Sequence, residues 1–291
     1  MMGEREFEDL LRSVSRSFYL TMRYLPAAMR PAISVAYLLA RVSDNVADVS
    51  SAPPEQRRAV LRLMRAVLSG QADAADLEEL FMRLQAPALA GSPSEQVLLR
   101  LYGDWLWRLE QLPPEQGTLV RRVLVTIIGA QLEDLEPAVD LSTEEQTLRY
   151  CDGVAGCVGV FWTELGFAAL GGGFAPPEQR VLMAEAGRRY GRGLQLVNIL
   201  RDEEEDAARG RRYFAAAERE RWCSRAERYL RDGVDYARRL RAFRLRFATL
   251  LPALLGLGTL RLLRARQGTE RVKLPRRAVY AAMLAAAWRS L

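Results

Sequence analysis

Two pairs of aspartates, each with four-residue spacing on an apolar segment, constrain this chain more than any other feature. The first pair is Asp44 and Asp48, and the second is Asp202 and Asp206. Residues four apart lie on one face of a helix, so each pair forms a carboxylate stripe beside buried leucine, isoleucine and valine. Asn198 extends the second stripe by one turn. Two such stripes far apart in sequence are what a cage of several Mg²⁺ ions between facing helices requires.

The residues around both stripes indicate an anionic ligand. Mg²⁺ prefers carboxylate and amide oxygens and keeps positions open for water and phosphate groups. Arg41 precedes the first stripe by one turn, and Arg211 and Arg212 follow the second. A diphosphate could bridge metal and arginines. The simpler interpretation of one D-x-x-x-D motif is a solvated acidic helix end with arginine counter-charges. A second stripe makes the metal site the better interpretation.

Almost every segment shows helical periodicity, and none shows sustained period-two alternation. At 291 residues and 49% hydrophobic content, the chain can bury a large core, and nothing in it reads as a linker. We therefore expect one all-α domain spanning residues 1–291, with helices around a central space. The predicted helices are Glu4–Val14, Pro31–Val49, Pro54–Leu68, Asp73–Leu84, Ser94–Leu112, Pro114–Leu135, Ser142–Leu170, one opened by Pro176 and Pro177 that carries the second stripe, Ala217–Leu251, Pro252–Gln267 and Pro275–Ser290.

Several classes of protein are excluded by composition. The sequence has no histidine, which removes Ser-His-Asp and Cys-His nucleophiles and every histidine-ligated metal centre. Cys151, Cys157 and Cys223 show no C-x-x-C spacing, so we expect them to be small buried apolar residues. The N-terminus is charged and no window holds eighteen uninterrupted apolar residues, so we expect a cytoplasmic protein.

The net charge of +6 comes almost wholly from arginine, because Lys273 is the only lysine. A basic stripe would suit an arginine-rich, helical nucleic-acid-binding protein, and this is the competing class. Acidic residues alternate with the arginines at helical spacing, however, which favours a solvated, salt-bridged face. We therefore expect no nucleic-acid partner. Peripheral contact with an anionic membrane is a third use of the same charge.

The run after Tyr150 does not fit a simple core helix. Gly153, Gly156 and Gly159 recur every third residue, and each costs a helix about 1 kcal/mol relative to alanine. Two interpretations remain open. Either small residues allow two helices to pack closely, or an apolar substrate lies against the bare backbone with Tyr150 at its polar end.

Four segments, in order, closely resemble the squalene/phytoene synthase family: Ser15–Phe18, Ala40–Asp48, Tyr150–Gly159 and Gln195–Asp206. The resemblance spans residues 15 to about 280. It implies an isoprenoid-synthase fold whose central apolar cavity is flanked by two aspartate-rich helices. It also implies a Mg²⁺-dependent prenyltransferase that joins two prenyl diphosphates, such as farnesyl diphosphate, head to head through a cyclopropyl diphosphate.

The resemblance assigns roles residue by residue. Tyr150 matches the tyrosine implicated in the first half-reaction. The implied metal ligands are Asp44, Asp48, Asn198, Asp202 and Asp206. The implied diphosphate-binding cations are Arg41, Arg201 and Arg211. The flap over one substrate corresponds to Arg16, Ser17 and Phe18. Further expected substrate contacts are Tyr37, Val154, Ala155, Gly156 and Gln195. Ala47 stands where eukaryotic squalene synthases often have a third acid, which leaves the number of metal ions open.

The segment from Val272 to Arg277 resembles the V-K-x-x segment of squalene synthases that reduce the cyclopropyl intermediate with NADPH. We therefore expect Lys273 and Arg276 to bind NADPH. No Rossmann fingerprint is present, so helix surfaces would have to build such a site. Phytoene, dehydrosqualene and hydroxysqualene synthases remain alternatives, because the sequence leaves open the donor chain length and whether hydride, water or proton loss quenches the final cation.

Overall fold

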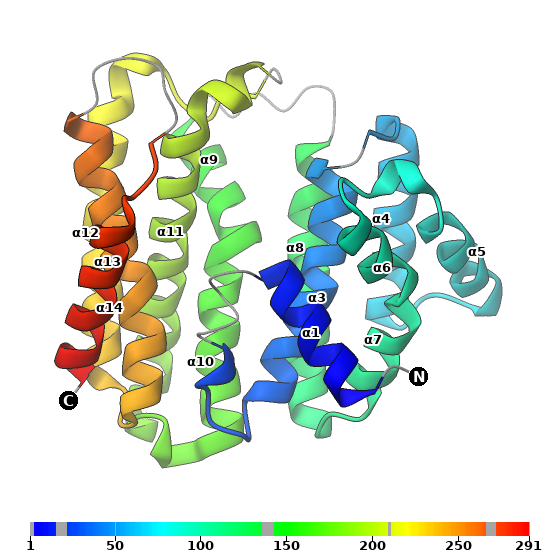
Figure 1. The fold of residues 1–291 in the computed structure, drawn as a ribbon, viewed down its shortest axis with the longest axis horizontal. Coiled ribbons are helices and arrows are strands. Elements are labelled where there is room, and N and C mark those ends of the chain that lie inside the picture. The colour runs from blue at the N-terminus through cyan, green and yellow to red at the C-terminus, as the bar shows by residue number, and fades with distance from the viewer. Residues whose placement is uncertain are drawn as a thin grey trace. The chain divides into compact units, whose positions relative to one another are not determined.

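The computed structural model describes residues 3–15, 22–49, 51–135, 143–208, 211–265 and 272–290. Within these ranges every regular element is a helix, which confirms the predicted all-α class (Figure 1). The contacts gather the chain into two compact units, Met1–Val139 and Asp140–Leu291. The expectation of one domain stays a prediction, and each unit is described by itself.

In the N-terminal unit, α3 is central and packs on α7 and α8, while α4 packs on α5 and α8 (Figure 1). Leu38, Leu39 and Val42 of α3 are fully buried, as their spacing predicts. Prolines occupy the first turns of α3, α4 and α8, where a missing N–H costs nothing. The α-helices are α1 (Glu4–Ser15), α3 (Arg30–Asp44), α4 (Pro54–Ser69), α5 (Ala74–Leu84), α6 (Pro93–Arg100), α7 (Tyr102–Glu110) and α8 (Pro114–Asp134). A π-helical segment, η1 (Asn45–Val49), continues α3, and a 3₁₀ turn spans Pro87–Leu89.

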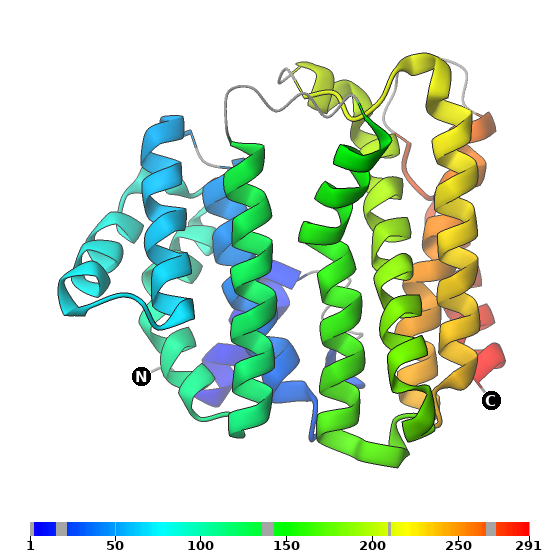
Figure 2. The ribbon, with the colours of Figure 1, turned by 180° about the vertical axis from the view of Figure 1, so that it is seen from behind.

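In the C-terminal unit, each long helix packs on the next: α10 on α11, α11 on α12, α12 on α13 and α13 on α14 (Figure 2). The sequence has a capping-box pattern that starts at Ser142 or Thr143, and in the structure Thr143 caps α9 in a reciprocal capping box with Gln146. Gly171 ends α10 with a φ of +51°. The α-helices are α9 (Glu144–Cys151), α10 (Cys157–Leu170), α11 (Arg180–Ala208), α12 (Arg219–Arg239), α13 (Phe243–Ala265) and α14 (Arg276–Ser290). A second π-helical segment, η3 (Asp152–Gly156), joins α9 to α10, and 3₁₀ turns span Gly171–Gly173, Pro177–Gln179 and Ala216–Glu218.

The predicted break at Pro252 is wrong. Pro252 lies inside α13, and the chain turns instead between Arg239 and Phe243. At the actual break, the Arg246 guanidinium donates to the carbonyl of Leu240 at 2.7 Å. Proline removes one hydrogen bond from a helix interior, and in that part of α13 the Tyr190 hydroxyl of α11 donates to the Thr249 carbonyl at 2.7 Å. Contacts between α13 and neighbouring helices therefore outweigh the helix-breaking tendency of Pro252.

The helix predicted over Ser94–Leu112 is also divided. Leu101 closes α6 and precedes α7 with a ψ of 14°, outside the helical range. The Trp105 indole donates back across this break to the carbonyl of Leu98 at 3.0 Å and is itself fully buried. Burial of that large side chain stabilises the bend.

Two helical stretches, Glu144–Gly173 and Phe243–Ala265, are long and apolar enough to cross a membrane by length and composition alone. Both are packed within the C-terminal unit, the first against α11 and the second against α12 and α14. Core helices of a folded unit have the same composition.

Candidate functional site

The first carboxylate pair lies where α3 changes into a π-helix. Asp44 is the last residue of α3 and is half-buried, whereas Asp48 lies in η1 and is exposed. The spacing predicted one regular α-helical stripe, and this is corrected by the π turn. A π turn inserts one extra residue into the helix and is frequent at functional sites. The two carboxylates therefore differ in their exposure to solvent.

Side chains from neighbouring helices hold this turn. Arg57 of α4 donates from Nη1 to the carbonyl of Ala47 at 2.7 Å. Gln131 of α8 donates from Nε2 to Oδ1 of Asp44 at 2.7 Å. Asn45 is fully buried, and neither its amide nitrogen nor its oxygen has a hydrogen-bond partner among the described residues. The spacing of residues in the sequence did not identify Arg57 or Gln131 as supports of this turn.

The electrostatics of the pair fit a divalent cation. Burial raises the pKa of Asp44 to about 7, and the negative charge of Asp48 adds to this, while Arg41 and the Gln131 hydrogen bond oppose it. The neighbouring cation therefore does not offset the burial and mutual repulsion of the two carboxylates. Hard oxygen donors in a site that favours added positive charge match Mg²⁺.

Arg41, the expected diphosphate ligand, is held by a partner on α6. Its Nη2 contacts Oε1 of Glu95 at 2.6 Å. The second carboxylate oxygen of Glu95 accepts the N–H of Gly91 at 3.1 Å. Tyr37, one turn earlier on α3, donates its hydroxyl to the carbonyl of Val14 at 3.1 Å and so ties α3 to α1.

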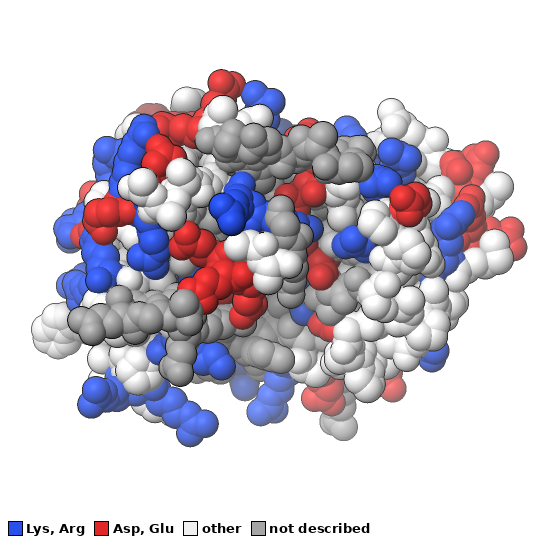
Figure 3. All heavy atoms as spheres, turned by 90° about the horizontal axis from the view of Figure 1, so that it is seen from above, with Lys and Arg blue, Asp and Glu red and all other residues white. Residues whose placement is uncertain are grey.

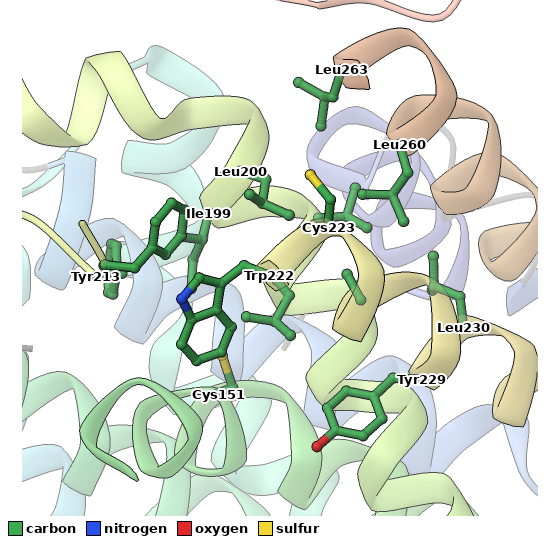
Figure 4. Close-up of a cluster of buried hydrophobic side chains, with 14 of the residues drawn as sticks. Cys151, Ile199, Leu200, Tyr213, Trp222, Cys223, Tyr229, Leu230, Leu260 and Leu263 are labelled. Atoms are coloured by element: carbon green, nitrogen blue, oxygen red, sulfur yellow. The ribbon is translucent and has the colours of Figure 1, made fainter. Parts of the chain in front are cut away.

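The second carboxylate stripe runs along the end of α11. Asn198 is exposed, while Asp202 and Asp206 are half-buried. Ile199 and Leu200, between them in sequence, point into a buried cluster with Trp222 and Cys223 of α12 (Figure 4). The apolar side of the helix thus fixes which way the polar stripe faces.

Neighbouring side chains already engage this stripe. The Arg201 guanidinium donates two hydrogen bonds to the Asp202 carboxylate, at 2.9 Å from Nε and 2.6 Å from Nη2. These bonds raise the pKa of Arg201. The amide of Asn198 faces Oε1 of Gln195 at 3.5 Å. The backbone N–H of Arg211 donates to the carbonyl of Asp206 at 2.8 Å. The glycine at position 210 predicts the end of this helix, but Gly210 lies outside the described residues.

Tyr150 lies near the end of α9 against an aromatic partner that the sequence reading did not single out. Its ring centroid is 5.1 Å from that of Tyr213, with the planes tilted by 33°. Tyr213 is buried, and its carbonyl accepts the hydroxyl of Thr147. Figure 4 shows Tyr213 beside Ile199 in the same cluster. The only signal for Tyr213 was its position just after the paired arginines.

The glycines after Tyr150 pack against α11, so the structure supports the close-packing interpretation. A Cβ at Gly159 would lie 1.9 Å from the carbonyl oxygen of Gly187, and one at Gly191 would lie 2.1 Å from that of Ala155. Gly156 is buried. A Cβ at Gly156 would meet Asp152 and Arg188 of α11, and the expected substrate contact of Gly156 stays a prediction. Val154 is half-buried, and its substrate contact stays a prediction.

A charged pair that the sequence reading missed anchors η3. Arg192 of α11 donates from Nε to Oδ1 of Asp152 at 2.6 Å and makes a second bond to Oδ2. A Cβ at Gly156 would lie 2.4 Å from that Oδ1. Glycine at position 156 thus leaves room for the ion pair, which fixes the π turn next to Tyr150.

The remaining predicted residues lie apart from these groups or outside the description. Lys273 lies in the non-helical stretch 272–275, Arg276 begins α14, and both are exposed. Val272 packs against the cluster of Figure 4, which fixes the start of this stretch. Arg16, Ser17 and Phe18 lie outside the described residues.

The structure thus places the predicted residues in two sets. Asp44, Asp48 and Arg41 belong to the N-terminal unit. Tyr150 and the stripe of α11 belong to the C-terminal unit. Among the residues the structure describes, no three acidic or thiol side chains gather around one point.

The arginine-rich helix α12 has the salt-bridged face that the sequence predicts. Most of its arginines contact a carboxylate on the same or a neighbouring helix, which leaves less charge for a nucleic acid. The pairs are Arg219–Glu203, Arg221–Glu144, Arg221–Glu218, Arg225–Glu144, Arg231–Glu227 and Arg238–Asp235.

Known proteins share both sequence and fold with this chain. The squalene/phytoene synthase family model matches residues 11–221. A presqualene diphosphate synthase from Rhodopseudomonas palustris is 32% identical over 202 residues, covering 69% of this chain and 59% of the relative. A phytoene synthase from Thermus thermophilus is 30% identical over 207 residues, covering 70% of this chain and 56% of the relative. The match therefore spans less than two thirds of each relative's length.

Solved structures show the same fold at lower identity. The squalene synthase TcSQS with a bound ligand superposes with a TM-score of 0.78 at 21% identity, covering 97% of this chain and 86% of the other. A dehydrosqualene synthase in complex with ligand superposes with a TM-score of 0.63 at 18% identity, covering 96% and 93%. The fold is the all-α isoprenoid-synthase fold. Because the family model matches residues 11–221 of the 291 in this chain and both aspartate motifs stand in their expected order, this chain belongs to the squalene/phytoene synthase family.

Proposed function

We propose that this protein condenses two molecules of farnesyl diphosphate head to head into presqualene diphosphate. The observation that carries the proposal is that each unit holds a carboxylate pair with an arginine engaged beside it. Relatives named presqualene diphosphate synthase, from three bacteria, are 30–32% identical to this chain. A cytoplasmic protein would meet the soluble diphosphate substrates directly.

In the proposed site, Asp44 and Asp48 hold Mg²⁺ in one unit, and Asn198, Asp202 and Asp206 hold it in the other. Bound Mg²⁺ would neutralise the diphosphate and make it a better leaving group. Arg41, Arg201 and Arg211 would bind the diphosphate oxygens, for which a planar guanidinium is well suited. The partners that now hold Arg41 and Arg201 keep both guanidinium groups oriented before substrate arrives.

The reaction breaks the C1–O bond of one farnesyl diphosphate and releases diphosphate. The resulting allylic cation forms a bond to the C2–C3 double bond of the second molecule, and loss of a proton from C1 of the first molecule closes the cyclopropane. We assign Tyr150 to guide this proton to the released diphosphate, a role that general acid–base catalysis makes worth about 10²–10⁴-fold. Tyr213 and the Asp152–Arg192 pair hold the segment that carries Tyr150.

A second step, reduction to squalene, is the finer part of the proposal. In that step NADPH would supply a hydride to presqualene diphosphate, and the second diphosphate would leave as NADP⁺ forms. Lys273 and Arg276 would bind the NADPH phosphates, because both are exposed cations in one short segment. A compact ammonium at position 273 suits a phosphate where a planar guanidinium does not fit.

Substitution at each stripe tests the condensation. Asp48→Asn and Asp202→Asn should each lower turnover of farnesyl diphosphate with Mg²⁺ by at least about 10²-fold, since each removes one charge from a metal site. Glu204→Gln is the matched control, because Glu204 is exposed on α11 between the two stripe aspartates and off their face. Circular dichroism should show unchanged helix content in all three. Near-normal activity of Asp48→Asn or Asp202→Asn would reject the metal-site assignment.

Product analysis by mass spectrometry, with and without NADPH, tests the second step. We expect presqualene diphosphate without NADPH and squalene with it. Lys273→Ala should leave the first product unchanged and raise the NADPH concentration needed for the second. A product spectrum that ignores NADPH would confine the protein to presqualene diphosphate or indicate a hydroxysqualene or dehydrosqualene synthase. Conversion of geranylgeranyl diphosphate in preference to farnesyl diphosphate would instead indicate a phytoene synthase.

A further inference from the structure

The last helix, α14, carries its large apolar side chains on the outside. Tyr280, Leu284 and Trp288 are 63%, 73% and 79% exposed. Their four-residue spacing places them in one stripe along the helix. The side of α14 that packs on α13 is instead formed by small residues such as Ala282 and Ala286. Single exposed apolar residues are ordinary, but a contiguous stripe marks a surface that contacts another apolar phase.

Cations stand at both ends of this stripe. Arg277 is seven residues before Leu284 and so starts the same face, and Arg289 follows Trp288. Both arginines are exposed, and α14 contains neither Asp nor Glu. Seen from above, the outer edge of the C-terminal unit, at the left of the view, carries basic side chains with acidic ones among them (Figure 3). The surface that an occupant meets is apolar along its middle and positive at its ends.

We propose that α14 docks this protein on an anionic lipid surface, with the helix lying in the plane of the interface. The side chains of Trp and Tyr favour the boundary between head groups and acyl chains. A leucine between them inserts into the acyl region, and arginines reach lipid phosphates. Attraction of the arginines to anionic head groups adds to the apolar burial.

The size and charge of the stripe favour lipid over a second copy of the chain. Large aromatic side chains bury about 150–250 Å² each, so three partly exposed side chains offer on the order of 400 Å². A stable protein interface buries about 800 Å² on each partner. Two copies of α14 facing each other would also bring arginines together without a single acidic residue on either helix.

Vesicle flotation tests the proposal. The full-length protein should float with vesicles of phosphatidylcholine and phosphatidylglycerol (70:30) and stay unbound with pure phosphatidylcholine. Tyr280→Ser/Leu284→Ser/Trp288→Ser should lower the bound fraction at least tenfold. Arg277→Glu/Arg289→Glu should do the same on the anionic vesicles. Because the altered side chains are exposed, circular dichroism should show every variant folded.

Two controls match these changes elsewhere on the C-terminal unit. Val181→Ser removes an apolar side chain that is 84% exposed but lies outside the stripe. Arg231→Glu/Arg238→Glu reverses two exposed arginines of α12. Both controls should float like the unaltered protein. Failure of the unaltered protein to float, or unchanged flotation of the stripe variant, would overturn the proposal. A stripe variant that turns a dimer into a monomer by light scattering while floating normally would assign the face to a second copy.

Discussion

Alanine at position 159 would put a methyl group into the contact between α10 and α11. The added Cβ would lie 1.9 Å from the carbonyl oxygen of Gly187 and 2.4 Å from its carbonyl carbon. Both atoms belong to a helix backbone, so neither can rotate away as a side chain would. Alanine favours a helix by about 1 kcal/mol over glycine, whereas overpacking costs about 1–3 kcal/mol and more where the backbone must move. Because the helix backbone must move here, we take the upper end of that cost and expect a net loss of about 2 kcal/mol.

Gly129→Ala is the matched control. Gly129 lies inside α8, and a Cβ there would meet no atom within 4 Å. The same substitution should therefore stabilise the protein by up to about 1 kcal/mol through helix propensity alone. The two variants have identical chemistry and opposite expected signs.

Urea and thermal unfolding, followed by circular dichroism, measure both effects. In a chain of this size, a loss of about 2 kcal/mol corresponds to a melting temperature roughly 4–8 °C lower. The two compact units can unfold separately, and circular dichroism reports on both together. A second probe that reports on the C-terminal unit is therefore needed. Tryptophan fluorescence of Trp162, on α10 itself, supplies that probe. Equal stability of Gly159→Ala and Gly129→Ala would refute the close-contact reasoning.

Two further predictions concern the site. Burial and Asp48 raise the Asp44 pKa from 3.8 to about 7, so the folded state prefers the protonated carboxyl and loses stability as pH rises from about 4 through 7. In EDTA, Asp44→Asn should thus be more stable than the unaltered protein at pH 8, by about 2 kcal/mol for this half-buried group, with no gain near pH 4. A gain independent of pH would contradict this cause. Tyr150→Phe should slow cyclopropane formation about 10²-fold or more in single-turnover assays while substrate binding stays within about threefold. Normal accumulation of presqualene diphosphate would remove Tyr150 from the proton step.

Much of this architecture could be predicted because its signals are local. Proline at a first turn, glycine at Gly171 and the apolar spacing of α3 each act through the backbone or burial of a few neighbouring residues. The carboxylate stripes were visible for the same reason, since residues four apart share a helix face. The starts of α3, α4 and α8 were therefore predicted to within one residue, while the metal-binding role of the stripe residues stays a prediction.

The features that the sequence could not reveal depend on partners distant in the chain. The π turn after Asp44 is held by Arg57 and Gln131, which belong to other helices. The break after α12 is stabilised by Arg246, and Asp152 finds Arg192 forty residues away. In a π turn each backbone hydrogen bond spans one residue more than in an α-helix. The spacing of apolar residues does not reveal this change, so the sequence predicts a regular α-helix at both π turns.

In the proposed site, the ion pair between Arg201 and Asp202 would couple the binding of metal to the binding of diphosphate. When a metal ion takes the Asp202 carboxylate, the guanidinium loses its partner and gains affinity for a phosphate oxygen. A phosphate that draws the arginine away frees the carboxylate in turn, so the two ligands assist each other by the same factor. Titration of Mg²⁺ with and without inorganic diphosphate should show this reciprocal gain, and Arg201→Gln should shrink it. In the proposed site, Arg201 and Asp202 would therefore keep each other oriented until diphosphate binds the arginine and Mg²⁺ binds the aspartate.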